Sequence, residues 1–169
     1  MSPPTQPLRD EHRELLPHVE ALRSTADMVG DAAPSELLRA IDSVHAFLTQ
    51  QLIPHAQGEE AALYPAVQRV MGSREATATM SRDHAEVVRL AEELAALRGE
   101  IAAAALTTGR ARSLRRVLYS LHAVLRLHFA KEEEVYLPLL DAALTPEAAQ
   151  SVFQQMEEAA ARARSRTGG

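Results

Sequence analysis

Apolar residues recur every three or four positions along nearly the whole chain, from Leu8 onward. This spacing places them on one stripe of a helix, and no segment alternates for long with the period of two that a strand requires. Glycine and proline interrupt the pattern at a few short turns. The sequence therefore predicts four long helices and a shorter fifth one, over about residues 8–29, 35–65, 73–105, 110–138 and 146–164.

The short turns decide how these helices are arranged. Four long helices joined in this way favour an all-α antiparallel up-down-up-down four-helix bundle, here with an additional C-terminal helix that covers it. We expect a disordered lead over 1–7, which holds three prolines, the bundle and fifth helix over 8–164, and a flexible tail over 165–169. Pro54 is expected to kink the second helix, and Pro65 to end its regular part.

Composition excludes several kinds of function. The 169 residues include no cysteine, which removes disulfides, iron–sulfur clusters and thiolate metal sites. The net charge of −5 argues against a dedicated nucleic-acid binder. No apolar run approaches the roughly 20 residues of a membrane span, and the start shows no export signal. We therefore expect a cytoplasmic monomer without nucleic-acid or membrane partners.

The chain repeats itself at an offset of 72–73 residues. A histidine near the start of each half, His12 and His84, is followed about 43 residues later by a His-x-x-x-Glu unit. A proline stands ten residues after the histidine of each unit. Each half is therefore predicted to be a helical hairpin with one histidine on its first helix and His-x-x-x-Glu on its second.

The repeated histidines and glutamates interrupt apolar stripes, where a metal centre would explain them. Residues at i and i+4 share one helix face, so each unit directs an imidazole and a carboxylate to the same side. Burying four imidazoles and two carboxylates would be costly unless a partner satisfied them. Imidazole and carboxylate without thiolate suit iron or another first-row ion, and two bridging carboxylates suit a pair of ions. The alternative is a core network of histidines hydrogen-bonded to glutamates.

At these residues the sequence resembles the hemerythrin family, in its His-His-Glu cation-binding branch, over about residues 8–140. The resemblance implies a non-haem centre of two iron ions per chain, bridged by the two glutamates and an oxo or hydroxo group. Ferritin-like bundles are the nearest rival, but they use Glu-x-x-His pairs, which are absent here. The implied metal ligands are His12, His55, Glu59, His84, His128 and Glu132.

One departure from the family bears on the function. Oxygen-carrying hemerythrins have a second histidine four positions after the one on the third helix, where this chain has Val88. One ion should therefore lack an imidazole, and the open position favours reaction with small oxidants, hydrogen peroxide or nitric oxide, over reversible oxygen transport. The expected partners are such peroxide or diatomic molecules. Two alternatives remain: an oxygen- or iron-binding and storage protein, and an iron or oxygen sensor acting through a partner.

Several other residues are predicted to lie outside the centre. The remaining histidines are off the ligand face or far along the helix, and two tyrosines are expected to pack at the bundle end, although either could act as a phenolate ligand or gate. Three further glutamates are interpreted as solvated charge, one of them, Glu60, as a distant candidate for the missing ligand. These residues are His18, His45, His122, Tyr64, Tyr136, Glu60, Glu133 and Glu134.

Overall fold

The computed structural model describes residues 2–167, and within them every regular element is a helix. Short π-helical turns (η1, η2, η4) and a 3-10 turn (η3) join some of the α-helices into longer rods. The elements are α1 (Gln6–Met28), α2 (Pro34–Phe47), η1 (Leu48–Leu52), α3 (Ile53–Gly58), η2 (Glu59–Leu63), α4 (Tyr64–Met71), η3 (Arg74–Thr77), α5 (Ala78–Ala103), α6 (Thr108–Lys131), η4 (Glu132–Tyr136), α7 (Leu137–Ala143) and α8 (Pro146–Thr167).

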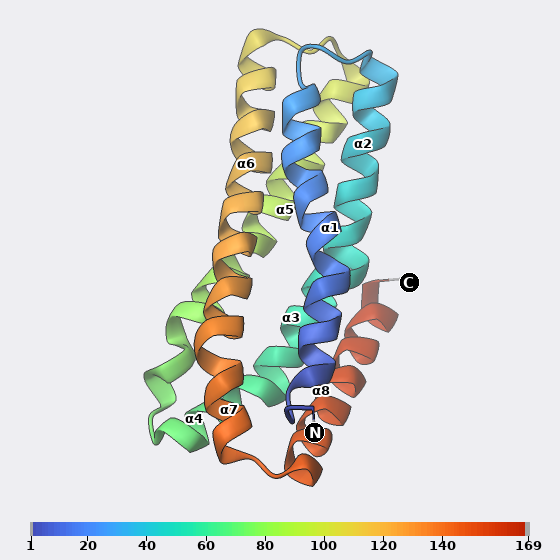
Figure 1. The fold of residues 1–169 in the computed structure, drawn as a ribbon. Coiled ribbons are helices and arrows are strands. Elements are labelled where there is room, and N and C mark those ends of the chain that lie inside the picture. Colours follow the sequence, from blue (N-terminus) through green and yellow to red (C-terminus); the bar gives the residue numbers. More distant parts are fainter. Residues whose placement is uncertain (1, 168–169) are drawn as a thin grey trace.

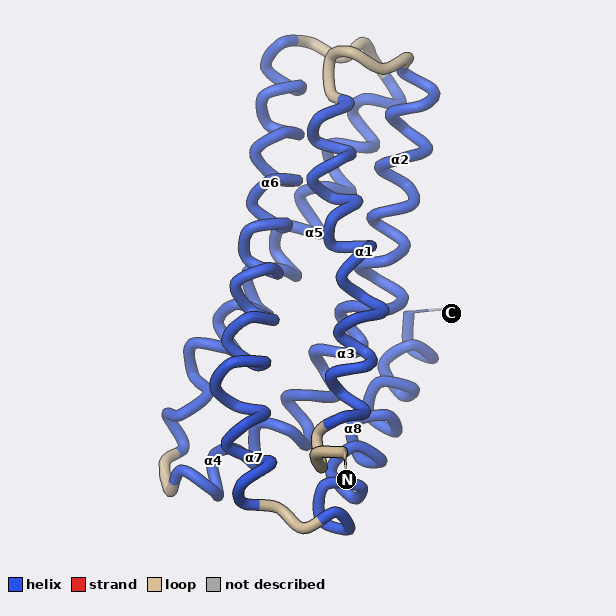
Figure 2. Tube along the Cα trace, viewed as in Figure 1, coloured by secondary structure: helices blue, strands red, loops and turns tan. Residues whose placement is uncertain are grey.

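Long helical rods lie side by side, joined by turns at their ends (Figure 1). The first rod is α1, the second runs from α2 through α4, the third is α5 and the fourth runs from α6 through α7. The α1–α2 and α5–α6 turns meet at one end of the molecule, and the α4–α5 and α7–α8 turns lie at the other. Loops are confined to these ends (Figure 2). The predicted all-helical bundle is confirmed.

Both ends of the chain are more ordered than the sequence predicts. Helix α1 begins at Gln6, and the buried Thr5 donates its backbone N–H to Asp141 Oδ1 at 2.8 Å. The disordered lead over 1–7 is therefore wrong for residues 5–7, because this contact ties the start of α1 to α7. Helix α8 likewise continues through the predicted tail to Thr167. Positions 1, 168 and 169 lie outside the described residues.

Prolines widen the long rods locally without ending them. Pro54, Pro65 and Pro138 each stand two positions after a π-helical turn. Proline has no N–H and its ring meets the carbonyl of the fourth residue before it, and a turn closed by i→i+5 bonds accommodates that conflict. The second rod therefore passes Pro65 and ends at Gly72, whose φ of 68° is the left-handed conformation that glycine readily adopts.

The core is divided along the bundle into two apolar clusters with polar residues between them. One cluster includes Leu15, Leu52, Val87 and Phe129, and the other includes Leu8, Ala62, Met80 and Tyr136. On every rod the predicted ligands lie in sequence between a member of one cluster and a member of the other. The bundle thus contains a polar layer sealed by apolar residues on both sides. Within residues 2–167 no helix is both long and apolar enough to cross a membrane.

Helix α8 packs closely on the rod that carries His55 and Glu59. A Cβ atom added to Gly58 would lie 2.7 Å from the backbone oxygen of Met156, so glycine lets the two backbones approach. Val152 and Met156 of α8 belong to the apolar cluster that includes Leu8 and Met80. Helix α8 therefore packs beside α3, the helix that carries His55 (Figure 1).

We predict that Gly58→Ala destabilises the protein, because the added methyl group would meet a backbone atom that cannot rotate away. The expected loss in the free energy of unfolding is about 1–3 kcal/mol, measured by urea denaturation. The matched control is Gly99→Ala in α5, where nothing lies within 4 Å of the added Cβ atom. That variant should gain up to about 1 kcal/mol from the better helix propensity of alanine. Equal effects at the two positions would contradict the close packing of α8.

Candidate metal centre

All six predicted ligands meet in the polar layer. His12 comes from α1, His55 and Glu59 from the second rod, His84 from α5, and His128 and Glu132 from the fourth rod. Five of them are buried, and the side chain of His84 is 11% exposed. Four rods thus each contribute to one small, almost dry cluster.

The carboxylate of Glu59 lies between two pairs of histidines. Its Oε1 is 3.0 Å from His55 Nε2 and 3.8 Å from His12 Nε2. Its Oε2 is 3.2 Å from His84 Nε2 and 3.8 Å from His128 Nε2. Each oxygen of one carboxylate therefore faces a different histidine pair.

Glu132 repeats this arrangement from the opposite rod. Its Oε2 is 3.4 Å from His12 Nε2, and its Oε1 is 3.4 Å from His128 Nε2. Two groups with metal-ligand spacing result: His12, His55 and Glu59 in one, and Glu59, His84 and His128 in the other, with ligand atoms within 4.8 Å of one another in each group. Glu59 belongs to both groups.

Unpaired polar atoms show that hydrogen bonding alone does not satisfy this cluster. Within the described chain, His12 Nε2, His55 Nε2, both oxygens of Glu59 and Glu132 Oε2 are buried without a hydrogen-bond partner. Such atoms are rare in native proteins, because each loses its interaction with water. The alternative of a closed histidine–glutamate network is therefore poorly satisfied, whereas the donor set fits metal cations.

In each of the four histidines, Nδ1 points away from the centre and is hydrogen-bonded to a carboxylate other than Glu59 and Glu132. Nδ1 of His55 donates to Glu11 at 2.9 Å, and Nδ1 of His128 to Asp83 at 3.1 Å. Glu11 directly precedes His12 and Asp83 directly precedes His84, so the repeat makes the two contacts equivalent. A carboxylate at Nδ1 fixes the ring and, in neutral imidazole, leaves the Nε2 lone pair facing the centre.

The other two histidines use the residues that follow the central glutamates. Nδ1 of His84 donates to Glu60 at 2.9 Å, and Nδ1 of His12 donates to Glu133 at 2.8 Å. Glu60 and Glu133 keep contact with water, as predicted, since their side chains are 40% and 32% exposed, but each also accepts a hydrogen bond from a predicted ligand histidine. The exposed Glu134 also agrees with that prediction.

Buried charges shift the titration of the cluster. Burial lowers the pKa of His128, but Asp83, Glu132 and Glu59 outweigh it and raise that pKa to about 11. Burial also lowers the pKa of His55, but the neighbouring carboxylates of Glu59 and Glu11 outweigh it and hold that pKa well above its usual range. Burial would raise the pKa of Glu59, but the facing histidines keep it well below its usual range. Without a metal, these pKa shifts favour protons on His55 and His128, which offset part of the negative charge of the carboxylates.

Tyr64 reaches the centre, contrary to the expected role in packing at the bundle end. Its hydroxyl donates to Glu132 Oε1 at 3.1 Å and lies 3.3 Å from His84 Nε2 and 3.4 Å from His128 Nε2. Burial, and then the charges of Glu59 and Glu132, raise the pKa of Tyr64 far above its usual range. The Tyr64 hydroxyl therefore lies beside His84, where the sequence predicts an open position, while Val88 is 38% exposed.

The remaining predictions about histidine and tyrosine agree with the structure. His18 stacks on Phe47, with ring centroids 5.1 Å apart, and His122 Nε2 lies 3.2 Å from Glu20. His45 is half-buried and belongs to neither ligand group. Tyr136 donates to the backbone oxygen of Ala76 at 2.8 Å, as expected for packing at the bundle end.

One of three comparisons with known proteins found a match, and it agrees with the metal-ligand spacing of the cluster. Searches of curated proteins and of solved structures returned no significant match. A family model described as the hemerythrin HHE cation-binding domain matches residues 4–140, a range that includes all six predicted ligands. Since this match covers most of the chain, the protein belongs to the hemerythrin HHE cation-binding domain family.

Proposed function

We propose that this protein holds two iron ions in an antiparallel up-down-up-down bundle and reacts with small oxidants such as hydrogen peroxide or nitric oxide. The arrangement of Glu59 carries the proposal, because its two oxygens face two different histidine pairs. One ion would be held by His12 and His55, the other by His84 and His128, with Glu59 and Glu132 shared. Imidazole and carboxylate donors suit iron, and a pair of such ions supplies redox chemistry.

Tyr64 makes the two halves of the centre unequal. Tyr64 follows the π-helical turn that starts at Glu59, and Leu137 follows the turn that starts at Glu132. The repeat therefore offers a phenol to the His84–His128 side and an apolar side chain to the His12–His55 side. The first side would be the more fully coordinated one, which leaves the His12–His55 side for an added small molecule.

The chemistry of a phenol favours reaction with oxidants over oxygen transport. Metal binding at the His84–His128 side would take the place of the Tyr64 proton, because the hydroxyl already lies among the ligand atoms. An anionic oxygen donor stabilises the more highly charged, ferric state. We propose that the protein acts as a cytoplasmic monomer whose partners are peroxide or diatomic molecules.

The direct test is to load the purified protein with iron and to mix it with hydrogen peroxide and, separately, nitric oxide. Metal analysis should give two irons per chain, and the visible spectrum should change with either molecule, with peroxide consumed. A stable and reversible oxygenated spectrum would contradict the proposal, and so would zinc as the bound metal or a single iron at saturation.

We predict that Glu59→Ala or Glu132→Ala loses both irons together, because each carboxylate faces both histidine pairs. His12→Ala should weaken mainly one iron, since His12 belongs to one group only. Elemental analysis after anaerobic iron loading measures both effects. His18→Ala and His45→Ala are the controls and should keep full metal content. Retention of two irons by Glu59→Ala would disprove the bridging role.

Tyr64→Phe should keep two irons but lose the phenolate-to-iron absorption band of the oxidised protein. The predicted cause is the removal of the single hydroxyl that lies among the ligand atoms. Tyr136→Phe is the matched control, because its hydroxyl bonds to the backbone of Ala76. The absorption spectrum of the ferric form reports the difference. An unchanged band in Tyr64→Phe would show that the phenol does not bind iron.

A further inference from the structure

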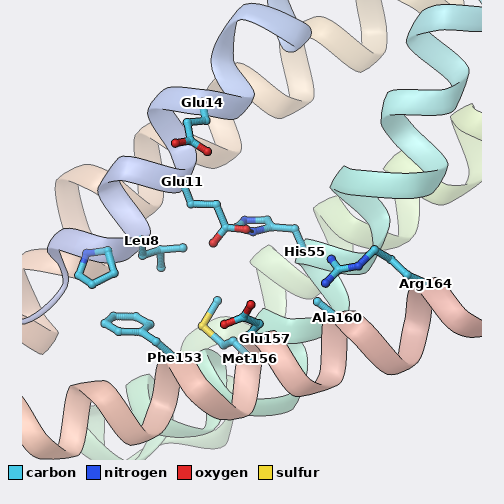
Figure 3. A pocket seen from close by; sticks show the side chains of 10 residues that line it. Leu8, Glu11, Glu14, His55, Phe153, Met156, Glu157, Ala160 and Arg164 are labelled. Atoms are coloured by element: carbon cyan, nitrogen blue, oxygen red, sulfur yellow. Dashed lines mark hydrogen bonds and ion pairs between the residues drawn. The ribbon is translucent and has the colours of Figure 1, made fainter.

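A cavity of about 410 Å³ lies between α1 and α8, beside the metal centre. Its lining includes three carboxylates, Glu11 and Glu14 from α1 and Glu157 from α8, and one cation, Arg164. Figure 3 shows Glu11 and Glu157 approaching the same region from opposite walls. Apolar side chains, among them Met156, complete the wall.

One of the residues that line this cavity, His55, is also a predicted metal ligand. His55 lines the cavity from α3, although its side chain is only 4% exposed, and its Nδ1 donates to Glu11 at 2.9 Å. Its Nε2 is one of the buried atoms without a hydrogen-bond partner. In Figure 3 the ring of His55 extends from α3 into the space between α1 and α8, toward Glu11. Glu11 is 49% exposed, so one carboxylate contacts both solvent and a ligand histidine.

The charge of this cavity favours cations. Three carboxylates against the guanidinium of Arg164 and the imidazole of His55 leave an excess of negative charge at its lining. Within residues 2–167, no hydrogen bond or ion pair engages Glu14 or Glu157, so these two carboxylates are not neutralised by a neighbour. A recess lined by one sign of charge raises the local concentration of the opposite ion and speeds its association.

We propose that this cavity is the route by which a divalent cation, ferrous iron in the cell, enters the centre. Glu14 and Glu157 attract the hydrated ion, and Glu11 replaces part of its water shell beside His55. Rotation of the flexible Met156 side chain provides space. The inference rests on the proposed function, because it assumes a metal centre at His12 and His55. Helix α8, which forms one wall of the cavity, lies outside the residues 4–140 that match the family model.

The opening on the opposite side of the centre is less suited to a cation. A pocket of about 220 Å³ reaches His84 between the second rod and α5, with mostly apolar walls that include Ile53 and Val88. Its one carboxylate, Glu60, already accepts hydrogen bonds from His84 and from Ser81. This second pocket therefore provides the comparison for a test of the first.

The test measures the rate at which metal-free protein takes up Co²⁺ or Fe²⁺, by stopped-flow absorbance at low and high salt. Glu14→Gln/Glu157→Gln should slow uptake roughly tenfold at low salt, and the difference should vanish at high salt. The final metal content should not change. Glu36→Gln/Glu92→Gln, which alters the net charge equally but at exposed positions outside the cavity, should take up metal at the normal rate.

Three results would overturn the entry route. Uptake by Glu14→Gln/Glu157→Gln could equal that of the unmodified protein, the control pair could be slowed as much, or Val88→Trp at the second pocket could slow uptake more. A final content other than two ions, with the expected order of rates, would contradict the two-iron function alone. Failure of the unmodified protein to bind any metal would refute both.

Discussion

The structure depends on the burial of two carboxylates, Glu59 and Glu132, at the middle of a helical bundle. Both side chains are fully buried. An isolated carboxylate in such surroundings would cost many kcal/mol and would take up a proton instead. Here histidines from all four rods face the two groups, and burial of the charge becomes possible only when the rods are assembled. The polar layer between the two apolar clusters is therefore a consequence of this one requirement.

The π-helical turns connect this requirement to the path of the chain. Two of the three turns start at the central glutamates, Glu59 and Glu132, and a proline follows each turn. In a regular α-helix Tyr64 would point about 140° away from Glu59, whereas a turn closed by i→i+5 bonds returns the fifth residue toward the first. The same local widening that accommodates Pro65 thus brings the phenol of Tyr64 into the centre. π-Helical turns within α-helices are frequent at functional sites.

Sequence patterns predicted which six histidines and glutamates meet in the polar layer, because the two features that identify them are local. The spacing of His-x-x-x-Glu fixes one helix face, and the apolar stripe shows that this face is buried. The outer carboxylates depend on which rods are neighbours: Glu60 of η2 reaches His84 of α5, and Glu133 of η4 reaches His12 of α1. Spacing along one helix carries no such information. An α-helical period continued across η2 places Tyr64 away from the centre, and the apolar pattern does not reveal the π-helical turn that brings it back.

Charge balance gives an independent reason for bound cations. Six carboxylates surround the centre: the two central ones, and four that accept hydrogen bonds from the histidines. Lys131 pairs with Asp83, and Arg9 is shared between Glu133 and Asp141. An excess of negative charge therefore remains around the centre, which bound cations would neutralise. In their absence the raised pKa values of His55 and His128 supply protons as a partial substitute. Metal binding must displace these protons, so the centre is built to exchange protons for cations.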